Sequence, residues 1–438
     1  MRGYGLSIVQ EPPHPNPLPF FGEREHTELA ARSPIHKISR GGKKPQAERV
    51  GESCMDFELP EDIRLLRETV RKFVDRELIP IEMNSMDGPD LKPEVQASLE
   101  AKARELGLWK LDTPAEFGGQ GLSLLALAVV WEEVHRSIAL PSRGDGVFGP
   151  SPRPILLRLP EKMKERYLYP LLEGKKSAAF AQTEPDAGSD PGRMTTRAVR
   201  QGDHYVINGY KRFISHVKGA DFLQLVAATD PSKGSRGGLS VFIVDIDTPG
   251  LSVVRETRHM MGDVTYEIAL DDVKVPVENL VGEEGQGMRE AQSWISRNRV
   301  HQATHGLGVT QRCLELIGKY AQQRVTFGEP LAKRQAVQFA VADLYMKYQT
   351  GQLLTHRTAW KVDKGIASRH DAYMCKIFCT ELGYEAADRC IQFHGAMGLT
   401  TEMPIEAMWR RSRSYLITGG PAEIMRATLA REVFKLYQ

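Results

Sequence analysis

The chain has 438 residues, more than one hydrophobic core usually holds, so its length predicts two to four domains at ~100–200 residues each. Its composition of 41% hydrophobic and 26% charged residues is typical of a globular protein, and no apolar run reaches the ~18 residues of a membrane span. Of the 58 Lys/Arg and 56 Asp/Glu residues, eight and six lie in residues 1–54, so the remainder is formally neutral. Without a sustained basic stripe, a nucleic-acid binder is excluded.

Residues 1–54 differ in composition from everything that follows. Five prolines crowd between residues 12 and 19, and the rest of the segment shows no hydrophobic periodicity. Such a segment supports no core, and it has neither the apolar stretch of a signal peptide nor the acid-poor composition of a transit peptide. We therefore expect a disordered or non-native N-terminal extension.

The cysteine pattern indicates the redox state of the cellular compartment. The chain has five cysteines, an odd number, and none of them forms a CxxC pair. Reduced, structural thiols fit this pattern best, and they favour a cytoplasmic location.

A helical domain is predicted over residues 55–175. Ile63, Leu66, Val70 and Phe73 recur at helical spacing behind an acidic first turn. Further helical patterns cover about 91–107, 122–140 and 161–173.

The hydrophobic period changes in the middle of the chain. Over residues 176–287, short β-branched and aromatic runs such as HYVING and LSVFIVD alternate with Gly, Pro and Asp, which indicates a β-domain. Helical patterns then return within residues 288–438, at about 289–324, 336–365, 370–393 and 421–436. This order predicts an α+β multidomain fold and disfavours a doubly wound parallel sheet.

Residues 180–190, with the sequence FAQTEPDAGSD, carry the most informative motif. Small residues, hydroxyls and successive backbone N–H groups in a tight turn can approach an anion or a heteroaromatic ring, although a capping turn explains them equally well. The run resembles the first signature of the acyl-CoA dehydrogenase family, whose segment holds the flavin of FAD. The resemblance implies FAD contacts from Phe180, Ala181, Gln182, Thr183, Gly188 and Ser189. Among these, Thr183 is implied to meet the N1/O2 edge, where charge develops on reduction.

A second flavin segment is implied within NGYKRFISH. The family's usual centre is Trp-Ile-Thr or Trp-Ile-Ser, and this chain has Phe213, Ile214 and Ser215. The resemblance places Ser215 near flavin N5 and Phe213 over the ring. The alternative is a core aromatic beside an ordinary strand serine.

Two later segments also resemble the family's signatures. Residues 324–331, RVTFGEPL, precede Gln335 as in Arg-x-x-Phe-Gly-x-x-Leu-x-x-x-Gln, and residues 392–398, QFHGAMG, resemble Gln-x-x-Gly-Gly-x-Gly. Both are implied to reach the FAD of a neighbouring subunit, the first through the diphosphate and the second through the adenosine half. The implied contacts are Arg324, Thr326, Phe327, Gln335, Gln392 and Gly395, with Pro421 and Glu423 as further cofactor contacts. His394 has no partners at ligand spacing, so we expect no metal site.

The resemblance covers about residues 55–438 in order and at family spacing. It implies an N-terminal helical domain, a middle β-barrel-like domain and a C-terminal four-helix bundle, assembled as a homotetramer or homodimer. It further implies hydride transfer from an acyl-CoA substrate to FAD, with an electron-transferring flavoprotein as the acceptor. Implied substrate contacts are Ser189, Arg299, Gly419 and Gly420.

The sequence departs from the family at the general base, a carboxylate whose shielding from water raises its pKa. Most members carry it as the Glu of an aromatic-Glu-Gly-Thr run, where this chain has Gly419. Others carry it on a helix before an arginine, where this chain has Asn298 before Arg299.

Three explanations remain open for the base. Asp145 lies in the segment that approaches the acyl chain in relatives. Glu423 lies one turn past Gly419, although Gly420 as cap and Pro421 as first helical residue favour a capping box for it. Finally, the protein could be a flavin-dependent monooxygenase of the same fold, or a base-less FAD-binding subunit of a mixed assembly.

Overall fold

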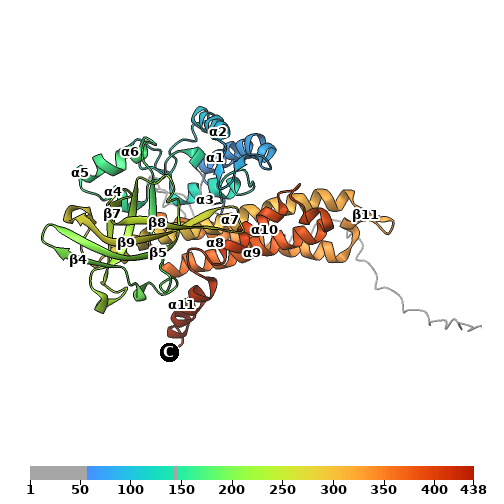
Figure 1. Cartoon of the computed structure of the whole chain (residues 1–438). Helices are drawn as coiled ribbons and strands as arrows, with labels where there is room; N and C mark the ends of the chain where they lie inside the picture. Colours follow the sequence, from blue (N-terminus) through green and yellow to red (C-terminus); the bar gives the residue numbers. More distant parts are fainter. Residues whose placement is uncertain (1–56, 143–145) are drawn as a thin grey trace, which may run out of the picture. The chain divides into compact units, whose positions relative to one another are not determined.

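The computed structural model describes residues 57–142 and 146–438, with only the backbone of residues 290–293. The expected N-terminal extension and the candidate base Asp145 lie outside the described residues. Along the described chain, helices come first, a β-sheet follows, and long helices end the sequence (Figure 1). No helix in these two ranges is long and apolar enough to cross a membrane.

The first helices are amphipathic or fully buried. Helix α1 (Glu61–Phe73) buries Ile63, Val70 and Phe73, whereas α3 (Leu124–Val134) is buried on almost every side. After α3 the chain turns at His135, so this helix is shorter than the predicted 122–140. The other elements here are the strands β1 (Met86–Asp87) and β2 (Asp90–Leu91) and the helices α2 (Pro93–Glu105), α4 (Pro154–Leu157), α5 (Glu161–Met163) and α6 (Tyr169–Leu172).

Buried carboxylates fix α3 between its neighbours. Glu133 accepts hydrogen bonds from Arg67 and Arg71 on α1 at 2.8 Å each. Glu132 accepts one from the Tyr348 hydroxyl at 2.6 Å, which ties α3 to the C-terminal helices. Because ionised side chains are retained inside a protein only when they are paired, this network holds α3 and the loop after it in place.

The middle of the chain forms one mixed sheet. Its strands are β3 (Ala178–Ala181), β4 (Arg197–Gln201), β5 (His204–Ser215), β6 (Phe222–Ala228), β7 (Leu239–Asp245), β8 (Leu251–Arg258), β9 (Val264–Pro276) and β10 (Leu280–Val281). Their order is β10-β7-β6-β4-β5-β9-β8, and β3 pairs with β6 in parallel. The sheet is open, with β10 and the largely exposed β8 at its ends, so the closed barrel that the resemblance suggested is not formed.

Alternation along β6 explains why that strand is central. Phe222 and Val226 face a core shared with α4 to α6, while Leu223 and Leu225 face a second core formed within the sheet. Successive side chains of a strand point to opposite faces, so a strand buried on both sides reads as a continuous apolar run. Helices therefore cover one face of the sheet at β6 and β7.

Long helices make up the rest of the described chain. They are α7 (Gly287–Gln323), α8 (Gln335–Asp363), α9 (Arg369–His394), α10 (Ile405–Tyr415) and α11 (Ala422–Lys435), and the hairpin β11 (Val325–Thr326) and β12 (Glu329–Pro330) joins α7 to α8. Four of these helices match the predicted patterns closely, whereas α10 was not predicted. Helices α7 and α9 approach so closely that a Cβ on Gly383 would lie 2.6 Å from Gly306.

The described cysteines lie in this helical region. Cys313, Cys375, Cys379 and Cys390 are buried and free, which agrees with the expected structural thiols.

Candidate functional site

The structure brings the first two predicted flavin segments together. The chain leaves β3 at Ala181, and the next residues run beside the end of β5. The Arg212 amide donates to the Thr183 carbonyl at 2.8 Å, and Lys211 Nζ donates to the Gln182 carbonyl at 3.2 Å. Thr183 therefore lies beside the strand end that carries Phe213.

A buried ion pair joins the two predicted flavin segments. Lys211 Nζ lies 2.8 Å from Glu184, and both side chains are almost fully buried. Glu184 also accepts hydrogen bonds from the Thr195 amide at 2.6 Å, the Thr195 hydroxyl at 2.7 Å and the Thr196 amide at 3.0 Å. Burial alone would raise the pKa of the Glu184 carboxyl, but Lys211 and these donors outweigh it and lower the pKa to about 2. Burial lowers the pKa of Lys211 to about 8 even beside the carboxylate.

The backbone around Phe213 is strained. Phe213 has a φ of 58° and His216 a φ of 60°, and β5 is irregular between Lys211 and Ile214. Left-handed conformations are unfavourable for bulky residues, and they gather at sites that bind ligands. The Phe213 ring is 47% exposed, whereas Ile214 is buried. The strand thus leaves the Phe213 ring partly exposed, with the Arg212 guanidinium 4.8 Å from its centroid, and an exposed aromatic ring fits a flat heteroaromatic ligand.

The rest of the first motif forms an exposed loop. Ser189 is exposed, and a Cβ added at Gly188 would meet no atom within 4 Å. Packing of the described chain therefore does not select glycine at residue 188.

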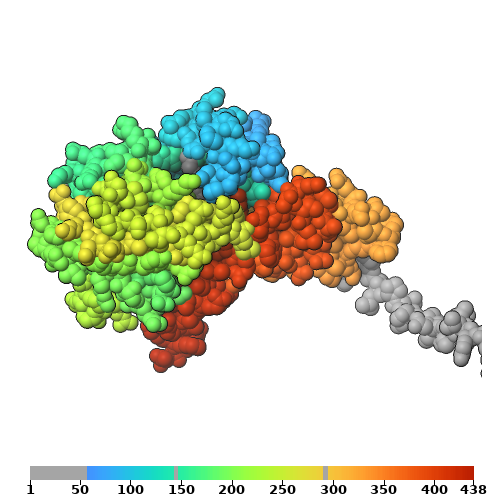
Figure 2. All heavy atoms as spheres, in the orientation of Figure 1, coloured from blue at the N-terminus to red at the C-terminus, as the bar shows by residue number. Residues whose placement is uncertain are grey.

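The two later predicted flavin segments lie together, at the C-terminal ends of α7 and α9. Tyr320 stacks on His394 with 4.4 Å between ring centroids, which joins the hairpin region to the end of α9. Phe327 has a φ of 51° and is 98% exposed at the hairpin tip, and this orange end lies on the molecular surface in Figure 2. Arg324, Gln335, Gln392 and Gly395 are also exposed, while Thr326 is half-buried.

This second group of residues is remote from Thr183 within one chain. Trp294 on α7 lies 5.7 Å from the Phe180 ring, measured between centroids, whereas Tyr320 lies at the other end of the same helix. At ~1.5 Å of rise per residue, about 40 Å of helix separates them. One chain therefore does not bring all the predicted FAD contacts to one place.

His394 is explained within the chain itself. Its Nδ1 lies 2.8 Å from the Cys390 carbonyl, and its ring is buried against Tyr320. Within the described ranges, no group of three or more His, Cys, Asp or Glu side chains is placed to hold a metal ion.

The loop between α10 and α11 contains the two glycines singled out in the sequence. Gly419 has a φ of +69° and Gly420 a φ of +106°. Arg299 Nε on α7 donates to the Gly419 carbonyl at 3.3 Å, and Lys376 Nζ on α9 donates to the Gly420 carbonyl at 3.0 Å. A Cβ on Gly419 would lie 2.6 Å from the amide of Gln302. The left-handed backbone therefore favours glycine at residue 419, and a larger residue would also have to displace the Gln302 amide.

The side chains that contact this loop are two cations, Arg299 and Lys376, and the amide of Gln302. Lys376 is fully buried, and burial, with a contribution from nearby Arg299, lowers its pKa to about 8. Gln302 is buried too, and its Oε1 has no hydrogen-bond partner. Neither residue was singled out in the sequence. The signal for Lys376 is a lysine between Cys375 and Ile377, both apolar positions of a helix.

The predicted capping box at Glu423 is not formed. Pro421 is the N-cap residue of α11 and has no side-chain capping hydrogen bond, so Gly420 is not the cap. A capping box needs a hydroxyl and an N–H at the N-cap, and proline supplies neither. Glu423 is exposed in the first turn of α11, and Asn298 is half-buried on α7.

Three family models match consecutive parts of the chain. Their descriptions are acyl-CoA dehydrogenase N-terminal domain over residues 60–175, middle domain over residues 179–273 and C-terminal domain over residues 285–434.

Individual relatives match over almost the whole of their own length. The mitochondrial short-chain specific acyl-CoA dehydrogenase of Mus musculus is 34% identical over 387 residues, 87% of this chain and 92% of the relative. The caffeyl-CoA reductase-Etf complex subunit CarC of Acetobacterium woodii is 33% identical over 382 residues, 86% of this chain and 99% of the relative. The structure of butyryl-CoA dehydrogenase from Megasphaera elsdenii matches with a TM-score of 0.76 and 28% identity, covering 87% of this chain and 100% of that one.

Proposed function

The chain belongs to the acyl-CoA dehydrogenase family, and from that premise we propose that it is an FAD-dependent enzyme that dehydrogenates an acyl-CoA thioester between its α and β carbons. The observation that carries the proposal is the partly exposed Phe213 ring on a strand end whose Arg212 amide binds the Thr183 carbonyl. The buried Lys211–Glu184 pair lies next to both segments. When bound, FAD supplies a ring that accepts two electrons as hydride.

The residues near Thr183 fit the flavin part of FAD. Phe213 offers a ring face, and the hydroxyls of Thr183 and Ser215 are the proposed donors to the flavin edge. Such preorganised donors stabilise charge that develops on reduction. Phe180, Ala181, Gln182, Ile214, Gly188 and Ser189 complete this proposed half of the site.

The other half of the FAD site is proposed to come from a second copy of the chain. Arg324, Thr326, Phe327, Gln335, Gln392 and Gly395 are about 40 Å of helix away from Thr183 in their own chain. A site that needs both groups requires assembly of at least two copies, which supports a homodimer or homotetramer. Pro421 and Glu423 remain proposed cofactor contacts near the loop of Gly419.

We propose that the loop of Gly419 and Gly420 binds the thioester end of the substrate. Its carbonyls are held by Arg299 and Lys376, so the loop backbone is fixed before any substrate arrives. The Gly419 N–H is then the proposed donor to the thioester carbonyl, an interaction that needs no side chain. Ser189 is a further proposed substrate contact.

The proposed reaction also needs a general base, for which Glu423 and Asp145 are the candidates. Glu423 is exposed to water, whereas a carboxylate that removes a proton from carbon is usually shielded from water. Asp145 therefore remains the first candidate. One observation favours a second function, that of a base-less FAD-binding subunit. The Gln302 amide occupies the space that an acidic side chain on residue 419 would need.

Product analysis tests the proposal directly. The purified protein is incubated with saturated acyl-CoA thioesters and an artificial electron acceptor, and thioesters are examined by mass spectrometry. Dehydrogenation removes two hydrogens from the acyl group. If an electron-transferring flavoprotein is the natural acceptor, as the Etf complex of the relative CarC suggests, it will replace the artificial acceptor. FAD-loaded protein that binds acyl-CoA and never yields the unsaturated product would favour the base-less subunit.

A further inference from the structure

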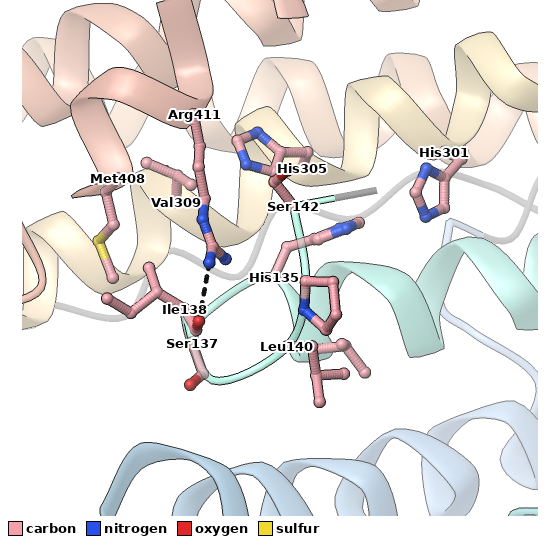
Figure 3. A pocket seen from close by; sticks show the side chains of 12 residues that line it. His135, Ser137, Ile138, Leu140, Ser142, His301, His305, Val309, Met408 and Arg411 are labelled. Carbon is pink, nitrogen blue, oxygen red and sulfur yellow. Dashed lines mark hydrogen bonds between the residues drawn. The ribbon is translucent and has the colours of Figure 1, made fainter. Parts of the chain in front are cut away.

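A small pocket lined by both polar and apolar residues lies beyond the loop of Gly419. It is lined by the loop after α3, by α7 and by α10, and its interior volume is about 20 Å³ (Figure 3). That volume has room for one to two water-sized groups, since one water needs ~10–15 Å³ by the same measure. The polar groups that carry the argument are Ser142, His305 and Arg411.

The pocket continues the proposed substrate path along α7. Arg299, Gln302 and His305 are spaced three residues apart, so they form one row on that helix. Gln302 meets the Gly419 position, and His305 lies about 4.5 Å further along the axis. The Tyr415 ring, four residues before Gly419, packs on His305 with 4.0 Å between centroids. An acyl group that starts at the loop therefore points its far end toward this pocket.

Arg411 brings a cation that forms no direct ion pair within the described ranges, although the carboxylates of Glu82 and Asp263 attract its charge. It donates one hydrogen bond, from Nη2 to the Ile138 carbonyl at 3.0 Å, and a guanidinium has five N–H groups to offer. Burial is the main reason that its pKa is lowered to about 10. Burying a cation is costly where no carboxylate contacts it directly, and a ligand oxyanion would reduce that cost.

Two further groups in the pocket lack a partner. His305 is only 5% exposed, and its Nδ1 makes no hydrogen bond. The Ser142 hydroxyl is buried without a partner as well. Burial and the neighbouring cations lower the pKa of His305 well below its ordinary value, so the ring is a neutral hydrogen-bonding group. Buried polar groups are nearly always satisfied in folded proteins, and each exception needs an explanation.

We propose that this pocket binds a carboxylate at the far end of the acyl group, so that the substrate is the CoA thioester of a dicarboxylic acid. Arg411 binds the carboxylate through charge-assisted hydrogen bonds, and Ser142 and His305 donate to its remaining oxygen lone pairs. This substrate class rests on the proposed function, because the pocket is placed relative to the loop of Gly419.

Calorimetric titration of FAD-loaded protein tests the proposal without depending on turnover. Matched thioesters of equal carbon number are compared: pentanoyl-CoA with glutaryl-CoA, and hexanoyl-CoA with adipoyl-CoA. The wild type is expected to bind the better-fitting dicarboxylic member about tenfold or more tightly than its partner, as for a charge-assisted hydrogen bond. Arg411→Met abolishes that preference. Arg413→Met, on the same helix and outside the pocket, is the matched control and keeps it.

Ser142→Ala keeps the test decisive if Arg411→Met does not fold. It removes a hydroxyl without a protein partner, so folding is preserved and the preference falls several-fold. The inference is overturned if the wild type binds both members of every pair equally, or if Arg411→Met weakens both members alike. If no thioester of either kind binds to FAD-loaded protein, the proposed function fails as well.

Discussion

Glu184→Gln tests the support of the proposed flavin surface. The carboxylate accepts four hydrogen bonds in a buried position, from two backbone amides, one hydroxyl and Lys211. A glutamine retains one acceptor oxygen and turns an NH₂ group toward donors. Breaking one partner of a buried pair typically costs ~3–5 kcal/mol, because the other charge stays buried and uncompensated. We expect a loss of unfolding free energy in that range.

Companion variants separate the ion pair from the rest of the network. Lys211→Met leaves the carboxylate with the donors of Thr195 and Thr196, so it should cost less than Glu184→Gln. The double variant should be more stable than Glu184→Gln alone, since the unpaired cation is gone. Asp230→Asn is the surface control, because that carboxylate also pairs with a lysine but is partly exposed.

The assay is urea-induced unfolding followed by circular dichroism, with FAD content measured after acid release. Glu184→Gln should lower both the unfolding free energy and the FAD content, because Lys211 also holds the Gln182 carbonyl beside Thr183. A change of less than ~0.5 kcal/mol, the range of ordinary surface substitutions, would refute the reasoning. So would strictly additive effects of the two substitutions.

Three further predictions follow. The pKa of Glu184 is lowered from 4.5 to about 2, so its stabilisation is complete above pH 4.5 and is lost as pH falls toward 2; the stability difference between wild type and Glu184→Gln should shrink over that window. Gly419→Glu should destabilise by ~1–2 kcal/mol from its left-handed backbone, and more from the clash with Gln302, so combining it with Gln302→Ala should recover part of the loss in thermal melts. If Asp145 is the base, Asp145→Asn should slow flavin reduction ~10²–10⁴-fold with FAD still bound, whereas loss of reduction in Glu423→Gln would transfer the role.

Hydrophobic periodicity predicted the long helices well and the short ones poorly. Helices α8 and α9 are 29 and 26 residues long, whereas α10 has only 11 residues and is rich in arginine and serine. The closed barrel came from the resemblance, and it failed because closure depends on the pairing of edge strands. β8 pairs only with β9 and is mostly exposed.

The residues that support the proposed site could not be predicted from the sequence. Lys211 lies in an ordinary alternating strand, and its buried partner Glu184 is 27 residues earlier. Gln302 and Gly419 meet only because α7 and the loop after α10 fold together. Contacts of this kind follow from packing between distant segments, which a motif does not encode. The two predicted flavin segments, by contrast, could be located from their motifs, and the Arg212 amide joins them at Thr183.

Anaerobic titration of the purified protein with acyl-CoA thioesters, followed at the flavin absorption band, tests the central claim most directly. The account predicts a yellow protein whose visible band bleaches on addition of a suitable acyl-CoA, because hydride from the substrate reduces the bound FAD. A protein that is colourless and cannot be reconstituted with FAD contradicts the account, and so does bound FAD that no acyl-CoA reduces.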